Sequence, residues 1–380
     1  MKLRKEIWDR VKLQDVCELI NGRAYGAHEL LSTGTPVLRV GNFFTNDKWY
    51  YSDLQLEEKK YCDNGDLLYA WSASFGPRIW EGGKVIFHYH IWKVDVSDKI
   101  TKQFLFYVLE GETDKIKSAS HGTTMPHITK TAMEKHCILL PPLKEQKRIA
   151  ALFQSIEMAV EKVEEQEKIL KALWKRLIDE FVSNKPSFGN LLDGKKLQTY
   201  NYCDVTNKLM RKIDPLTYGI ERIVAGENIE SEDFKIRTWQ KVGEGYLGPA
   251  FHVLFQPGDI LYGSRRTYLK KVALSDFEGV CANTTYVIRS NEKILLQDLL
   301  KHIMLSESFT QYSIGVSKGS TNPYINWKDL DNFSFKIPDL KTQREIVNIL
   351  DGILQIIEQL KQQKTTLKQL KQKLLNEILG

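Results

Sequence analysis

The feature that most constrains the fold of this chain is an internal repeat. Residues 318–350, KGSTNPYINWKDLDNFSFKIPDLKTQREIVNIL, align without a gap with residues 121–153, HGTTMPHITKTAMEKHCILLPPLKEQKRIAALF, at an offset of 197 residues. Because glycine and proline restrict where a backbone can turn, their recurrence predicts that one structural unit is folded twice. The identical pairs include Gly122 with Gly319, Thr124 with Thr321, Pro126 with Pro323, Ile128 with Ile325, Pro141 with Pro338 and Gln146 with Gln343.

Shorter matches continue the repeat upstream. NGDLLYA at 64–70 matches PGDILYG at 257–263 at an offset of 193, and VKLQ at 11–14 resembles KKLQ at 195–198 at an offset of 184. A changing offset indicates loops of different length on a shared scaffold. Loops tolerate such variation and carry much of a protein's function, so the two copies are expected to differ in what they bind.

A seven-residue apolar period begins after the prolines in each copy and predicts two long helices that need a partner along their length. Since the two periods match, we expect the two helices to pair along their length; the alternative is that each helix packs only on its own domain. Gln166 and Gln363 occupy matching positions near the helix midpoints, and they would face each other in the seam if the two helices ran antiparallel. The residues expected to pair the helices are Ile149, Ile156, Val163, Gln166, Leu170, Leu177, Ile346, Ile353, Leu360, Gln363, Leu367 and Leu374.

Length and composition fit two domains in a soluble protein. The 380 residues exceed one ordinary core, and no apolar run approaches the ~20 residues of a membrane span. The five cysteines are scattered and the first residues lack the apolar stretch of a secretory signal, which together favour a cytoplasmic location. The net charge of +6 is mild, so charge alone does not indicate a nucleic-acid partner.

Both copies contain short β-branched or aromatic runs bounded by glycine or proline, and one segment of helical periodicity. Each module is therefore expected to mix α and β structure, and the predicted fold class is α+β. The predicted strands are 34–43, 65–71, 84–96, 258–264 and 284–290, and the predicted helices are 103–120 and 296–314.

The motifs that would indicate catalysis are incomplete. Gly243, Gly245 and Gly248 form a G-x-G-x-x-G pattern, but a polar segment precedes it and Pro249 follows at once, so a surface turn is favoured over a dinucleotide or adenosylmethionine loop. Asn322-Pro323-Tyr324 approaches the N-P-P-Y motif of amino-methyltransferases without its second proline. Its repeat partner is Met125-Pro126-His127, which favours a shared turn over an amine-binding site.

Metal and cofactor sites are also not indicated. His88 and His90 alternate along a predicted strand, but no third ligand lies at a zinc-like spacing and there is no C-x-x-C. An ordinary strand face is the favoured interpretation. We therefore expect no catalytic residues, no metal and no cofactor, and predict that the chain is not an enzyme.

The sequence resembles the specificity subunit of type I restriction-modification enzymes over nearly its whole length. The resemblance rests on the opening WDRVKLQDVCELINGRAYG, on GDLLYA and GDILYG, on the two Gly-Ser/Thr-Thr-x-Pro-x-Ile turns, and on PPLKEQKRIAALF and PDLKTQREIVNIL. The pattern P-x-L-x-x-Q-x-x-I is the most specific, because it begins both predicted helices. The start of the second copy, GNLLDGKKLQTYNYCDV, departs from the pattern because it lacks the tryptophan and spacing of the first.

This resemblance implies a non-catalytic subunit in which each of two target recognition domains reads one half of a bipartite site in double-stranded DNA. The two helices would form an antiparallel coiled coil that sets the spacing and docks two methylation subunits. Restriction subunits would join through the complex. Adenosylmethionine and ATP sites would lie on those other chains. The implied division is residues 1–143 for the first recognition domain, 144–182 for the first helix, 183–340 for the second domain and 341–380 for the second helix.

Candidate DNA-binding residues lie in polar loops beside the repeated strands, since base edges and phosphates are met by basic, amide and hydroxyl groups. In the first module they are Arg23, Tyr25, Ser72, Ser74, Arg78, Thr123, Thr124 and His127. In the second they are Arg265, Arg266, Tyr268, Lys318, Ser320, Thr321, Asn322 and Tyr324.

Two other functions remain open from the sequence. A solitary adenine DNA methyltransferase would need the cofactor and amine motifs that are incomplete here, and methyl transfer by the purified chain would reveal it. A coiled-coil adaptor that bridges proteins without DNA would present two similar surfaces, whereas the loops of the two modules differ.

Overall fold

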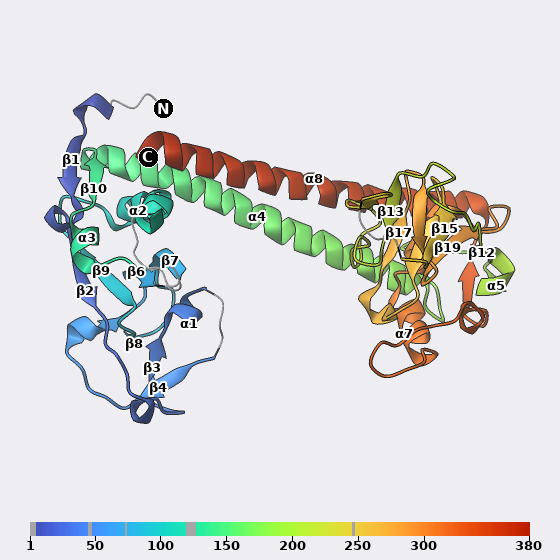
Figure 1. Cartoon of the computed structure of the whole chain (residues 1–380), viewed down its shortest axis with the longest axis horizontal. Coiled ribbons are helices and arrows are strands. Elements are labelled where there is room, and N and C mark those ends of the chain that lie inside the picture. The colour runs from blue at the N-terminus through green and yellow to red at the C-terminus, as the bar shows by residue number, and fades with distance from the viewer. Residues whose placement is uncertain (1–4, 45–47, 73, 119–126, 245–247) are drawn as a thin grey trace. The chain divides into compact units, whose positions relative to one another are not determined.

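The computed structural model describes residues 5–44, 48–72, 74–118, 127–244 and 248–380, and the chain forms two compact units (Figure 1). Unit 1 comprises Met1–Glu164 and Gln362–Gly380, and unit 2 comprises Glu165–Lys361. The two long helices, α4 (Leu143–Phe181) and α8 (Leu340–Leu379), each begin in one unit and end in the other. Within the described ranges, no helix is long and apolar enough to cross a membrane.

Unit 1 contains two four-stranded sheets and one two-stranded sheet. The first sheet has the order β2 (Cys17–Asn21), β9 (Ile91–Val96), β6 (Leu67–Ser72), β7 (Ser74–Ile79), and all of its pairings are antiparallel. The second has the order β4 (Tyr50–Ser52), β3 (Thr35–Leu38), β8 (Val85–Phe87), β5 (Tyr61–Cys62), with β3 and β8 parallel. The third pairs β1 (Asp9–Lys12) with β10 (Cys137–Leu140).

Unit 2 repeats this topology strand for strand. Its sheets have the orders β12 (Thr206–Leu209), β19 (Thr285–Ser290), β16 (Ile260–Gly263), β17 (Val272–Leu274), and β14 (Gln240–Lys241), β13 (Arg222–Val224), β18 (Gly279–Ala282), β15 (Phe251–Phe255). The β13–β18 pair is again parallel, and β11 (Gln198–Asn201) pairs with β20 (Ser334–Ile337). The predicted fold class, two similar mixed α/β domains with a repeated scaffold, is confirmed.

The helices differ more between the units. Unit 1 has α1 (Val40–Phe44), α2 (Lys102–Ser118) and α3 (Lys130–Glu134), and unit 2 has α5 (Tyr202–Val205), α6 (Gln297–Ile303) and α7 (Glu307–Gly315). The single helix predicted over 296–314 is wrong, because the segment forms two helices, α6 and α7, with a turn between them. Ser306 caps α7 by accepting a hydrogen bond from the Phe309 amide at 3.1 Å, which favours a new helix start over continuation.

The single strand predicted over 84–96 is also wrong. The segment is two strands, β8 and β9, which belong to different sheets, and His88 and His90 lie in the connection between them. Backbone hydrogen bonds hold this connection, with the Ile91 amide donating to the His88 carbonyl at 2.9 Å. Gly22 packs against it so closely that a Cβ atom would lie 2.3 Å from the His88 carbonyl oxygen. The two histidines therefore do not line one face of a strand.

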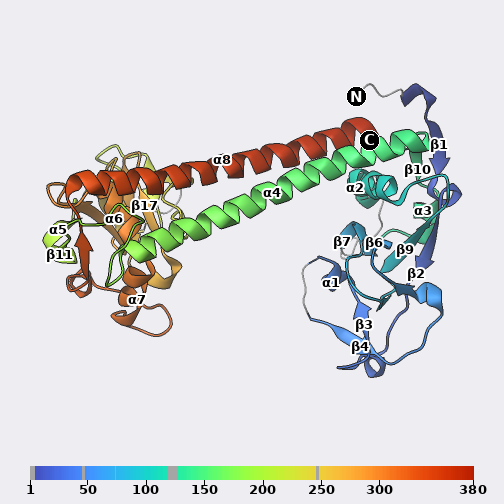
Figure 2. The same ribbon diagram turned by 180° about the vertical axis from the view of Figure 1, so that it is seen from behind.

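The two long helices pack antiparallel. In unit 1, Ile149 and Phe153 of the first part of α4 share a core with Leu375 of the last part of α8 and with residues of α2. Figures 1 and 2 show α2 beside the start of α4 and the end of α8. In unit 2, Trp174 and Ile178 of the last part of α4 share a core with the first part of α8. Each unit therefore joins opposite ends of the two helices, as the family resemblance implied.

The buried face of each helix has a second row of residues four positions after the predicted row. The predicted residues are buried at Ile149, Ile156, Val163, Ile346 and Leu360, and partly buried at Leu170, Leu177, Ile353, Leu367 and Leu374. The second row contains the buried residues Phe153, Glu167, Trp174, Phe181, Leu350, Ile357 and Ile378. Gln166 and Gln363 lie three positions after the first row and are exposed, so they do not form a polar pair buried in the seam.

Two buried glutamines explain the repeated pattern at the helix starts. Gln146 accepts a hydrogen bond from the Thr101 amide at 2.8 Å and donates to the carbonyls of Lys99 and Pro141, both at 2.9 Å. Gln343 does the same with the Leu296 amide at 3.0 Å and the carbonyls of Ile294 and Pro338 at 2.8 and 2.9 Å. Each amide thereby ties the start of a long helix to the turn that precedes α2 or α6.

A buried histidine predicts how the stability of unit 2 depends on pH. Burial lowers the pKa of His302 below its ordinary value of about 6.5, although the hydrogen bond between the ring and the Asp351 carboxylate acts in the opposite direction. His302 is 1% exposed, and its Nε2 atom lies 2.9 Å from Asp351 Oδ1. The Nδ1 atom is buried and has no hydrogen-bond partner among the described atoms. Lys301 Nζ donates to Asp351 Oδ2 at 3.0 Å. The folded unit therefore takes up a proton less readily than the unfolded chain.

We expect the unfolding midpoint of unit 2 to fall as pH drops from 7.5 to 5.5, because protonation of His302 then favours the unfolded chain. His302→Asn, which cannot be protonated in this range, should show a smaller fall between the same two pH values. His28→Asn, at an exposed position in unit 1, is the control and should follow the unmodified protein. An identical pH dependence for His302→Asn and the unmodified protein would contradict this prediction.

Candidate nucleic-acid interface

The loop at 318–324 of unit 2 closes on itself and docks on the end of β16. The Lys318 and Tyr324 amides donate to each other's carbonyls at 2.8 and 2.9 Å, and Gly319 has a positive φ of 87° in the turn. The Ile325 amide donates to the Ser264 carbonyl at 2.9 Å and the Arg266 amide to the Pro323 carbonyl at 2.7 Å. Arg265 and Tyr324, both predicted from the sequence, are thereby brought together as a β-bridge pair.

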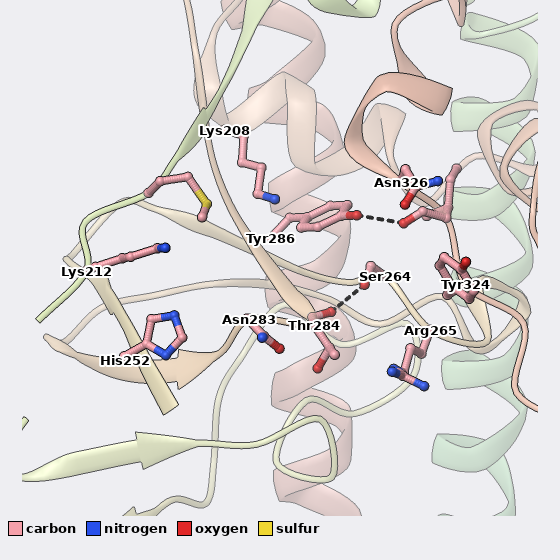
Figure 3. A pocket seen from close by; sticks show the side chains of 12 residues that line it. Lys208, Lys212, His252, Ser264, Arg265, Asn283, Thr284, Tyr286, Tyr324 and Asn326 are labelled. Atoms are coloured by element: carbon pink, nitrogen blue, oxygen red, sulfur yellow. Dashed lines mark hydrogen bonds between the residues drawn. The ribbon is translucent and has the colours of Figure 1, made fainter. Parts of the chain in front are cut away.

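A cavity of about 430 Å³ opens beside this loop (Figure 3). It is formed by the end of β12 and the residues after it, by β15, by the end of β16, by the turn before β19 and by the 324–326 segment. Its walls are joined by two hydrogen bonds, from the Tyr286 hydroxyl to the Ile325 carbonyl and from the Ser264 hydroxyl to the Thr284 carbonyl, both at 2.6 Å. The lining residues are Lys208, Met210, Lys212, His252, Ser264, Arg265, Asn283, Thr284, Tyr286, Tyr324, Ile325 and Asn326.

The cavity wall carries cations and no carboxylate. Lys208 Nζ lies 4.2 Å from the centre of the Tyr286 ring, and burial lowers the pKa of this lysine. Lys212 and Arg265 make no ion pair with any residue in the described ranges. Basic groups without carboxylate partners favour anionic or electron-rich ligands, because no protein charge offsets theirs.

The remaining predicted residues of unit 2 do not line this cavity. Ser320, Thr321 and Asn322 are exposed at the loop tip, and Tyr268 is 52% exposed in the turn after β16. Arg266 is exposed and adopts a left-handed backbone conformation with φ of 49°. Lys318 Nζ is 3.0 Å from Asp329 Oδ2, so its charge is partly neutralised.

Unit 1 has the same docking arrangement at the corresponding place. The Ile128 amide donates to the Trp71 carbonyl at 3.4 Å, and Ser72 forms a β-bridge with His127, as Arg265 does with Tyr324. Ser72 is 3% exposed, whereas His127 is exposed. Thr123 and Thr124 lie outside the described residues, as do Met125, Pro126 and Gly245.

The surface at this place in unit 1 is aromatic. The Trp71 indole donates to the Tyr89 carbonyl at 2.9 Å, and its ring lies 5.1 Å from that of His90. The rings of His88 and His90 are 4.9 Å apart. Burial lowers the pKa of His88 to about 4 and also lowers the pKa of His90, so both imidazoles are neutral near pH 7. One scaffold therefore presents neutral aromatic rings in unit 1 and cations in unit 2.

Arg23 and Tyr25 adjoin the aromatic surface of unit 1. Arg23 forms a two-pronged ion pair with Glu29 at 2.6 and 2.9 Å, which lowers the pKa of that carboxyl to about 2. The Arg23 guanidinium also lies 5.3 Å from the centre of the Tyr25 ring, and the Tyr25 ring stacks on His88 at 6.4 Å. These contacts position the loop after β2 against the β8–β9 connection.

The structure does not bring Arg78 to this surface. Ser74 and Arg78 are exposed on β7, and Arg78 lines a different cavity of about 620 Å³ between β7, α2 and α4. That cavity also contains Glu81, Glu110 and Glu157, so its charge is opposite to that of the unit 2 cavity.

Several residues of the interface were missed from the sequence. Lys208, Lys212 and Asn283 reach the cavity of unit 2 because β12 pairs with β19, a contact between distant segments. Trp71 and Tyr89 reach the surface of unit 1 in the same way, from two strand ends. The available signal in the sequence was the basic run Lys208–Lys212, in which three of five residues are Lys or Arg. Among the residues that the structure describes, no cluster of His, Cys, Asp or Glu could hold a metal ion.

Known proteins resemble the chain over almost its entire length. The family model for the type I restriction modification DNA specificity domain matches residues 5–171 and 197–369. The type I restriction enzyme MjaVIII specificity subunit of Methanocaldococcus jannaschii is 26% identical over 98% of this chain and 92% of its own. A crystal structure of the type I restriction-modification S subunit from M. genitalium covers 100% of this chain and 98% of its own with a TM-score of 0.59 and 14% identity. A second solved chain, from work on complex assembly and conformational transition of the type I restriction-modification system, covers 97% of both chains with a TM-score of 0.60 and 18% identity.

These family matches agree with the repeated fold. The chain belongs to the family of type I restriction-modification DNA specificity subunits, which are non-catalytic.

Proposed function

We propose that this specificity subunit recognises a bipartite site in double-stranded DNA, with one half read by each unit. One observation carries the proposal: the two units present different chemistry at the same place on the same scaffold. Unit 1 offers Trp71 and the neutral rings of His88 and His90, whereas unit 2 offers the cations Lys212 and Arg265. Side chains of such different chemistry favour different base edges, so the two half-sites are expected to differ in sequence.

The division of labour follows the predicted boundaries, with residues 1–143 and 183–340 as the recognition domains. The helices 144–182 and 341–380 would fix the spacing of the half-sites and dock two methylation subunits, and restriction subunits would join through the complex. The resemblance to a chain from a type I restriction-modification assembly supports these partners. The rival candidates, a protein-bridging adaptor and a solitary methyltransferase, gain no support from the contrast between the two surfaces.

An exchange of recognition domains tests the proposal. Residues 183–340 are replaced by the corresponding domain of another family member, and the recognised sequence is selected from randomised DNA duplexes in the presence of the methylation subunits. We expect one half of the site to change completely and the other half to stay the same. The reciprocal exchange of residues 1–143 is the matched control and should change the other half.

A change in both halves after either exchange would overturn the proposal, as would a change in neither. Because the second domain packs on α4 and α8 through Trp174, Ile178 and Leu350, the exchanged proteins are first compared with the parent by thermal unfolding.

A further inference from the structure

We propose that the cavity of unit 2 recognises the major-groove edge of a guanine, with Arg265 as the residue that determines the preference. This inference rests on the proposed function, because it names the base read by one of the two units. It starts from the lining of the cavity, which includes the basic residues Lys208, Lys212 and Arg265 and no Asp or Glu. Such a wall offers hydrogen-bond donors to a ligand that presents acceptors.

Guanine is the base whose major-groove edge fits this wall best. Its N7 and O6 are two neighbouring acceptors, and the two nitrogens of an arginine fork can donate to both at once. Adenine presents one acceptor and one donor there, and cytosine presents a donor, so neither satisfies a guanidinium in the same way. The absence of Asp and Glu from the cavity wall disfavours cytosine, whose amino group needs an acceptor.

The backbone of Arg265 is fixed by its neighbours, whereas its guanidinium is exposed. Its backbone bridges Tyr324, and the flanking Ser264 carbonyl and Arg266 amide are both hydrogen-bonded to the 323–325 segment. The guanidinium makes no ion pair with any described residue, so a base would not have to displace an internal carboxylate. Selective contact with a base requires a side chain whose backbone is fixed and whose donor groups are available.

The other polar groups of the cavity are less suited to dominate the choice of base. The Asn326 amide already donates to Asp329 at 3.0 Å, and Lys208 lies over the Tyr286 ring. Lys212 and Asn283 remain; a lysine lacks the two-nitrogen fork of arginine, and an asparagine would favour adenine. At the corresponding place in unit 1 the residue is Ser72, which is 3% exposed, so the guanine preference is confined to the half-site of unit 2.

The test uses the full chain with its methylation subunits and randomised duplexes, and assigns the half-site of unit 2 by the exchange of residues 183–340. We expect that half-site to contain a guanine that Arg265→Ala no longer selects, with a loss of about 10-fold to 100-fold in affinity for the original sequence. Arg265→Lys should retain part of the preference, because lysine keeps the charge and loses the fork. Lys293→Ala, at an exposed position of unit 2 that does not line the cavity, is the control and should leave the preference for guanine intact.

Base analogues separate a major-groove contact from other causes. Replacing that guanine by 7-deazaguanine removes N7 and should weaken binding of the unmodified protein while changing that of Arg265→Ala little. Inosine lacks only the minor-groove amino group and should be tolerated by both proteins.

Three results would overturn the inference while leaving the proposed function standing: a unit 2 half-site without guanine, an Arg265→Ala defect equal for all sequences as at a phosphate contact, or equal tolerance of 7-deazaguanine and guanine. A selection that yields no bipartite sequence for the unmodified protein would instead refute the proposed function itself.

Discussion

Replacing Gln343 by leucine is expected to lower the free energy of unfolding of unit 2 by about 3 kcal/mol, because a buried polar group that loses its partner costs ~1–3 kcal/mol. The substitution removes three hydrogen bonds and leaves the Leu296 amide and the Ile294 and Pro338 carbonyls without their partner. Gln343 is fully buried, so water cannot replace the lost amide. Urea unfolding measures the loss, and hydrogen exchange of peptides from 294–300 and 338–345 locates it.

Gln363→Leu is the matched control, since the same substitution is made at an exposed position of the same helix. It should change the free energy of unfolding by less than about 0.5 kcal/mol. Gln146→Leu should reproduce the Gln343→Leu effect in unit 1, where the amide makes the equivalent three bonds. Equal stability of Gln343→Leu and Gln363→Leu would show that the buried amide does not hold the helix start.

The repeat made most of the fold predictable because it recorded positions at which backbone geometry is restricted. Gly319 needs its positive φ, and Gln146 and Gln343 can make their bonds only where a strand, a turn and a helix start meet. Such positions recur when the topology recurs, and the strand orders of the two units are indeed identical. The matching periods indicated that α4 and α8 pair, whereas the antiparallel direction was implied by the family resemblance.

The errors arose where a local pattern fits two structures. An apolar run such as 84–96 does not show where a chain leaves one sheet and enters another, which is decided by the partners of β8 and β9. Along the helices, a seven-residue period allows a second buried row three or four residues after the first. The large side chains Phe153, Trp174 and Phe181 favour four, and this choice places Gln166 outside the seam.

The candidate site was predictable only in part. Arg265 and Tyr324 lie in turns that the repeat had marked, and the structure brings them together. Lys208 and Lys212 depend on the pairing of β12 with β19, and a single sequence does not specify such a pairing between residues far apart in the chain. The DNA contacts themselves remain predictions.

Reversing the charge of Lys371 is expected to release the end of α8 from the rest of unit 1. The free energy of unfolding of that unit should fall by about 3 kcal/mol, which is in the range for breaking a buried ion pair. Lys371 Nζ lies 2.7 Å from Glu157 Oε1 on α4 and 2.8 Å from Glu110 Oε1 on α2. Its side chain is 18% exposed, so solvent screens these contacts only in part. In Lys371→Glu, three carboxylates would crowd one site without a cation between them.

Lys373→Glu provides the control, because this lysine is 72% exposed and pairs only at 3.8 Å with Glu377. Its effect should stay below about 1 kcal/mol, as for surface ion pairs. Adding Glu110→Lys to Lys371→Glu should restore most of the stability, since it returns a cation to the site and leaves the bond from the Tyr107 hydroxyl to Glu157 intact. Urea unfolding and limited proteolysis of residues 362–380 measure the loss and the rescue.

The same experiment tests the direction of the helix pair. Only an antiparallel arrangement brings the last turns of α8 against Glu157 in the first half of α4, since a parallel one would place Lys371 beside residues near Trp174. If Lys371→Glu and Lys373→Glu were equally harmless, the contact between α8 and unit 1 would be absent in solution. Restoration by Glu110→Lys, by contrast, requires that α2 and the end of α8 meet at this point, which ties the last residues of the chain to the first recognition domain.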